Sequence, residues 1–139
     1  MKRNGFSLIE LMIAVAIVGI LGAIAVASYI GNVHSTNRTD ATRSMTIDAQ
    51  ALERCYSQAF TYSGCSTAAA GTSTSAQGYY SIVIAIGTPP TSYTITATPV
   101  KAPQLTDSSC ASFTLNSAGT QGATTSGGVN NTATCWGST

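Results

Sequence analysis

The chain has 139 residues and a mass of 14.2 kDa, which is the size of one domain and argues against a multidomain enzyme. Only 8% of its residues are charged, against about 25% in an ordinary globular protein. Its polarity comes from hydroxyl groups, on 17 Ser and 21 Thr. A net charge of +1 and a single His argue against a strongly basic nucleic-acid-binding protein and against most enzymes. With four Cys in so small a chain, the composition favours an extracytoplasmic structural protein.

The segment from Phe6 to Ile30 is apolar or small at all but four positions. As a helix with a rise of about 1.5 Å per residue it is long enough to cross a bilayer core of about 30 Å. Lys2 and Arg3 precede it, and no comparable basic cluster follows closely. The positive-inside rule therefore places the N-terminus in the cytoplasm and the rest of the chain outside.

Three interpretations of this segment compete: a signal peptide cut after Ala27, a plain membrane anchor, and a span retained for assembly. Glu10 helps to distinguish these interpretations. Placing a charged side chain at the centre of a membrane span costs about 2.5 to 3.5 kcal/mol of insertion free energy, and less near the interface. Neither a signal peptide nor an anchor gains from this carboxylate. An assembling helix gains if a positive group of a neighbouring subunit, such as a free amine at Phe6, pairs with it in apolar surroundings.

The string from Gly5 to Ile13, GFSLIELMI, resembles the prepilin signature of type IV pilins, and the likeness continues to Leu21. The resemblance implies that a prepilin peptidase cuts between Gly5 and Phe6 and removes the leader 1–5. It also implies N-methylation of Phe6 and makes Glu10 the family's assembly glutamate.

The chain departs from the family pattern in its first helix, where many members have a proline at the position of Ala27. No proline precedes Pro89 in this sequence. Gly19 and Gly22 remain as weak points, each about 1 kcal/mol less favourable than Ala in a helix interior.

After Ile30 the pattern becomes amphipathic. Apolar residues recur at helical spacing, at Val33, Ala41, Met45, Ala49, Leu52, Tyr56 and Phe60. The charged residues lie off that stripe and are expected on an exposed face, with Asp40 and Arg43 paired at i, i+3: Arg38, Asp40, Arg43, Asp48, Glu53 and Arg54. The two parts together predict one helix of about 50 residues that ends near residue 60.

Residues 61–78 are rich in Ser, Thr, Ala and Gly and are predicted to form a surface loop. Alternating apolar residues then predict three strands, with a short fourth around Ala133 to Trp136. The strand residues on the buried face are Tyr80, Ile82, Ile84 and Ile86, then Tyr93, Ile95 and Ala97, then Ala111, Phe113 and Leu115. The fold class is therefore α+β, a long helix packed on a small antiparallel sheet. Its globular pilin domain covers 31–139, with the sheet and a C-terminal disulfide loop in 79–139.

Four cysteines allow three pairings. We prefer the local one, Cys55 with Cys65 and Cys110 with Cys135, because the first pair joins the helix end to its own loop and the second brackets the last strands. Loops of these lengths contribute about 3 and 3.5 kcal/mol by the chain-entropy estimate. No Cys-x-x-Cys motif indicates redox chemistry.

No catalytic, cofactor or metal motif is recognised, and His34 is the only histidine available for a Ser-His-Asp arrangement. The sequence therefore predicts a non-enzymatic structural subunit, a major or minor pilin, of a bacterial type IV pilus used for adhesion, twitching motility or DNA uptake. Its expected partners are other pilins, the prepilin peptidase and an inner-membrane assembly machine with a separate ATPase. The expected locations are the inner membrane before assembly and the extracellular pilus after it.

Two alternatives remain. The first is a pseudopilin of a type II secretion system, against which the Cys110 to Cys135 loop and the lack of an acidic calcium-type cluster argue. The second is a secreted disulfide-bonded module whose signal peptide is removed.

Overall fold

The computed structural model describes residues 7–65 and 72–137, except the side chain of Ala27. It divides into two compact units, residues 1–33 and 34–139. One helix, α1 (Leu8–Ala59), has 52 residues, which confirms the predicted helix of about 50. Its backbone stays helical through Gly19, Gly22 and Ala27.

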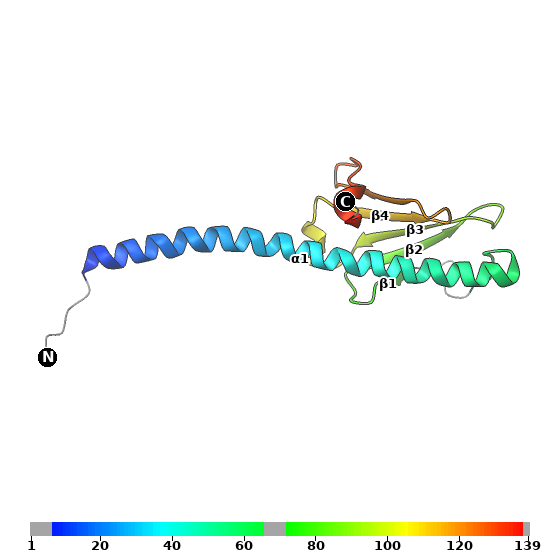
Figure 1. Ribbon diagram of the computed structural model, residues 1–139, viewed down its shortest axis with the longest axis horizontal. Helices are drawn as coiled ribbons and strands as arrows, with labels where there is room; N and C mark the ends of the chain where they lie inside the picture. The colour runs from blue at the N-terminus through cyan, green and yellow to red at the C-terminus, as the bar shows by residue number, and fades with distance from the viewer. Residues whose placement is uncertain (1–6, 66–71, 138–139) are drawn as a thin grey trace. The chain divides into compact units, whose positions relative to one another are not determined.

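In the second unit, the part of α1 from His34 onward runs along a five-stranded antiparallel sheet, with strands in the order β1-β2-β3-β4-β5 (Figure 1). The strands are β1 (Thr72–Thr74), β2 (Tyr80–Ile86), β3 (Tyr93–Pro99), β4 (Ser112–Asn116) and β5 (Gln121–Thr124). A 3₁₀ turn, η2 (Gln104–Thr106), lies between β3 and β4, and a short helix, α2 (Thr132–Trp136), follows β5. This helix-on-sheet arrangement confirms the α+β prediction.

The core forms between one face of the sheet and the predicted stripe of α1. Ala41, Met45 and Leu52 of the stripe are fully buried, whereas Ala49 and Tyr56 pack partly against them. The facing strand residues are buried as their alternation predicts, with Ile86 partly so: Tyr80, Ile82, Ile84, Tyr93, Ile95, Ala97, Phe113 and Leu115. Ala111, predicted on the same face of the third strand, instead precedes β4 and is half-buried. The opposite face of the sheet carries mainly Ser and Thr side chains, together with Val83 and Ala85 of β2, and none of these strands carries a charged residue.

Three expectations about the elements are wrong. Ala133 to Trp136 lie in helix α2 rather than in a strand, and the sheet instead gains β1 and β5. Residues 61–78 are not entirely a surface loop, because Tyr62, Cys65 and Ser75 are buried; 66–71 lie outside the described residues. Phe60, predicted to continue the stripe, is 77% exposed because the helix ends at Ala59.

Candidate functional site

The start of α1 is set by Ser7 and Glu10. The backbone N–H of Glu10 donates to the Ser7 carbonyl (3.1 Å) and the Ser7 hydroxyl (3.2 Å), the N-cap half of a capping box with a Glu at the third helical position. The carboxylate of Glu10 also stands in the first helical turn, where the helix dipole favours negative charge. Gly5 and Phe6, the predicted cleavage and methylation positions, lie outside the described residues.

The large apolar side chains between Leu8 and Ile30 are exposed. They are between 48% and 76% exposed, and they include Leu8, Ile9, Leu11, Met12, Ile13, Val15, Ile17, Val18, Ile20, Leu21, Ile24, Val26 and Ile30. Moving one such side chain from water into apolar surroundings is favourable by about 1.5 to 3 kcal/mol. In the described part of the chain, α1 is the one helix long and apolar enough to cross a membrane. This half of α1 therefore requires lipid or other apolar helices around it.

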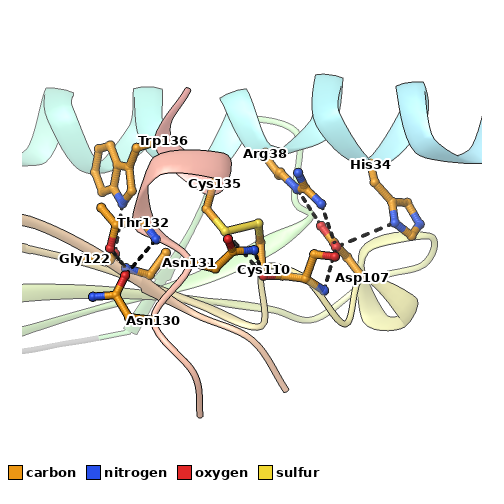
Figure 2. Close-up of a disulfide and its surroundings, with 12 residues drawn as sticks. His34, Arg38, Asp107, Cys110, Gly122, Asn130, Asn131, Thr132, Cys135 and Trp136 are labelled. Carbon is orange, nitrogen blue, oxygen red and sulfur yellow. Dashed lines mark hydrogen bonds and ion pairs between the residues drawn. A yellow bond between two sulfur atoms is a disulfide. The ribbon is translucent and has the colours of Figure 1, made fainter. Parts of the chain in front are cut away.

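The disulfides join Cys55 to Cys65 and Cys110 to Cys135, which confirms the preferred pairing. Figure 2 shows the second one joining α2 to the segment just before β4. The indole Nε1 of Trp136, also in α2, donates to the Gly122 carbonyl of β5 (2.9 Å). The C-terminal segment is thus held by a covalent and a hydrogen-bonded contact.

An ion pair that the sequence did not indicate joins α1 to the segment before β4. Arg38 donates from Nε and Nη2 to the two carboxylate oxygens of Asp107, at 2.7 and 2.8 Å (Figure 2). Asp107 is only 4% exposed. Burial alone raises the pKa of its carboxyl, but the hydrogen bonds and charge of Arg38 outweigh it and hold that pKa below its usual 3.8. Planar two-point contact of this kind is the stronger form of an ion pair.

His34 lies next to this pair, with Nδ1 3.8 Å from Asp107 and Nε2 3.5 Å from the Thr106 hydroxyl. That hydroxyl already donates to the Pro103 carbonyl at 2.8 Å. The 3.5 Å between Nε2 and this hydroxyl is longer than the distance of about 2.6 to 3.2 Å typical of a nucleophile and its base, and the hydroxyl proton is already shared with Pro103. Among residues 7–65 and 72–137, no three His, Cys, Asp or Glu side chains gather into a metal site.

Asp40 corrects another expectation, because it is buried rather than exposed and does not pair with Arg43. Its carboxylate accepts a hydrogen bond from the Ser75 hydroxyl and another from the Gln77 N–H at 3.0 Å. The turn before β2 folds over this carboxylate, and these donors satisfy it where water is excluded. Arg43 remains exposed, as predicted.

Arg43 lines a shallow hollow of about 490 Å³ between α1 and α2. The other lining residues are Thr42, Thr46, Ile47, Gln121 and Trp136. The hollow combines a cation, an amide and an indole ring on one exposed surface.

The comparisons with known proteins agree with this geometry. Residues 1–26 match the profile of the prokaryotic N-terminal methylation motif. The fold is similar to a type IV pilin from Shewanella oneidensis, with 26% sequence identity and a TM-score of 0.51 over 63% of this chain and 89% of that chain. A search of curated protein sequences gives no match. Fold and signature together define a type IV pilin, a structural rather than a catalytic class of protein.

A second family profile matches residues 27–114, more than half of the chain. Its description is type IV minor pilin ComP, DNA uptake sequence receptor. The chain belongs to this family of minor pilins. As a pilin subunit it assembles with other pilins in a pilus. Neither the pseudopilin nor the secreted-module alternative gains support from these comparisons.

Proposed function

We propose that the chain is a minor subunit of a type IV pilus. A prepilin peptidase removes residues 1–5, Phe6 is methylated, and residues 6–30 hold the subunit in the inner membrane. An assembly machine with a separate ATPase then transfers it into an extracellular fibre. The exposed apolar half of α1 carries this proposal, because a helix that leaves lipid must enter other apolar surroundings, which the helices of neighbouring subunits supply.

Glu10 then has two roles that a mutation series can separate. One is to help begin the helix, because its backbone N–H donates to the Ser7 hydroxyl, and Gln at this position keeps that N–H. The other is to place a negative charge opposite the Phe6 amine of a neighbouring subunit. Glu10→Gln keeps the first role and removes the second. Ser7→Ala removes the cap and keeps the charge.

We expect Glu10→Gln to lower incorporation into sheared fibres at least tenfold, because breaking a buried ion pair costs about 3 to 5 kcal/mol. The unassembled subunit should stay folded in the membrane fraction. Ser7→Ala should still be incorporated. Immunoblots of sheared fibres and membranes measure both. Wild-type incorporation of Glu10→Gln would show that the charge of this residue is not required for assembly.

A second function, DNA binding during uptake, is suggested by the description of the family. The hollow beside Arg43 supplies contacts of the required kind, since arginine contacts phosphate and an aromatic ring stacks on bases. Electrostatics limit its strength. Residues 34–139 hold four basic and four acidic side chains, and Arg38 is already paired with Asp107.

The salt dependence of duplex binding tests this role. The exposed cations are Arg43, Arg54 and Lys101. Each phosphate contact contributes about 0.9 to the slope of the logarithm of the DNA-binding constant against the logarithm of the salt concentration. The magnitude of this slope should therefore not exceed about 2.7. Arg43→Gln should reduce it by about one contact, whereas Arg54→Gln, outside the hollow, serves as the control. No measurable binding, or equal effects of the two variants, would contradict a DNA site at the hollow.

A further inference from the structure

The connection between β3 and β4 exposes apolar and basic side chains together. We call residues 100–106 the proximal loop. Leu105 is 61% exposed and Val100 47% exposed, and Lys101 lies on the surface between them. The loop contains no acidic residue. Two exposed aliphatic side chains beside one lysine fit a surface that is apolar beneath and anionic on top.

The proximal loop is fixed to α1 at His34. Gln104 is fully buried, and its Nε2 donates to the His34 carbonyl (3.3 Å) and the Tyr80 hydroxyl (2.7 Å). At its other end, the Val100 N–H donates to the Tyr79 carbonyl at 2.9 Å. These contacts keep the exposed side chains of the loop close to His34.

His34 in turn is tied by the chain to the end of the apolar segment. It lies four positions after Ile30, and an extended chain reaches at most about 14 Å over four residue steps. Tyr29, an aromatic residue of the kind enriched at membrane interfaces, is 70% exposed just before that end. The headgroup layer adds about 5 to 7 Å beyond the hydrocarbon on each side. The covalent chain therefore keeps His34 close to the headgroups of any membrane that residues 6–30 span.

We propose that in the unassembled subunit the proximal loop docks on the outer leaflet of the inner membrane. Leu105 and Val100 lie at the boundary with the hydrocarbon, and Lys101 contacts anionic headgroup phosphates. This inference rests on the proposed membrane anchoring by residues 6–30. The ring of Tyr79, 5.5 Å from Lys101 Nζ, belongs to the same surface, where aromatic rings are favoured.

A weak contact is sufficient here, because the span already holds the loop at the membrane and makes docking an intramolecular event. One lysine near an anionic surface changes the ratio of docked to free loop by about fivefold, equivalent to about 1 kcal/mol. Such a contact orients the globular unit before assembly and still releases it when the subunit is extracted.

The test uses the full chain in lipid nanodiscs with a soluble gadolinium chelate, which relaxes solvent-exposed amides in NMR spectra. In discs that contain phosphatidylglycerol, the membrane should shield the Leu105 amide from the chelate. The control is Val129, a similarly exposed valine on another loop, whose amide should remain accessible to the chelate. Lys101→Gln should lower the docked-to-free ratio about fivefold in anionic discs. It should have little effect in discs of phosphatidylcholine alone. Arg54→Gln is the charge-matched control and should leave Leu105 shielded.

Equal relaxation of Leu105 and Val129 in a chain that is inserted into the discs would overturn the docking and leave the anchoring intact. Failure of the chain to insert at all would overturn the anchoring and the docking with it. Leu105→Ser distinguishes the two contributions, because it removes the apolar contact and keeps the lysine. Unchanged shielding in both Leu105→Ser and Lys101→Gln would also contradict the proposal.

Discussion

At the scale of single residues, the contact between Arg38 and Asp107 ties α1 to the segment before β4. The two residues are 69 positions apart, and both carboxylate oxygens of Asp107 are used. The amphipathic pattern placed Arg38 on a solvated face, because periodicity along one helix carries no information about a distant loop that folds onto it. Asp40 was misplaced for the same reason, since its partners come from the turn before β2.

The depressed pKa of Asp107 makes this contact sensitive to acid. The unfolded carboxyl takes up a proton at a higher pH than the folded one, so the ion pair stabilises the fold above about pH 4. That stabilisation is lost as the pH falls through the folded pKa. Asp107→Asn should cost about 3 kcal/mol at neutral pH, because it leaves the Arg38 charge unpaired. Thermal unfolding of the full chain in detergent as a function of pH measures both effects.

Asp48 is the matched control for that experiment. Burial raises the pKa of its carboxyl, so the charged form of Asp48 destabilises the fold as the pH rises through that value. Asp48→Asn should therefore be neutral or slightly stabilising at neutral pH. A cost at Asp48 equal to that at Asp107, or an unchanged acid response in Asp107→Asn, would contradict this account.

At the scale of elements, the strongly periodic segments were predictable and the short ones were not. α1, β2 and β3 each repeat their apolar spacing over many residues. β1 has three residues, all exposed, and β5 is rich in Gly and Gln, so neither shows alternation. α2 has only five residues and is fixed by the disulfide of Cys135 and the hydrogen bond of Trp136. Such contacts are not visible in the local sequence.

The C-terminal end of α1 allows a direct test of helix termination. Phe60 follows the last helical residue with φ of +54°, and its N–H donates to the Tyr56 carbonyl at 2.7 Å. This is the left-handed cap position where glycine is favoured, and a non-glycine residue costs about 1 kcal/mol or more there. Phe60→Gly should therefore stabilise the full chain by about 1 kcal/mol in thermal unfolding. Phe60→Ala keeps the backbone cost and should not. A gain of equal size in both variants would assign the effect to the exposed ring instead.

At the scale of the whole molecule, the chain joins an apolar helical segment to a globular unit of nearly neutral charge. The globular unit has a core of its own and leaves a few apolar side chains exposed, whereas the first unit buries none of its apolar window. This division follows from composition and was predictable. Composition alone does not predict processing at Gly5 and Phe6 or an assembly role for Glu10. Both expectations come from the prepilin resemblance of residues 5–13.

The N-terminus of the mature protein distinguishes a pilin subunit from a secreted module with a discarded signal peptide. Intact mass and terminal peptide sequencing of the protein from membranes or sheared fibres should show a chain that begins at methylated Phe6 and retains the apolar half of α1. A mature chain that begins at Ser28 would show that this segment is a discarded signal peptide. That result would contradict the membrane anchoring, the assembly role of Glu10 and the docking of the proximal loop together.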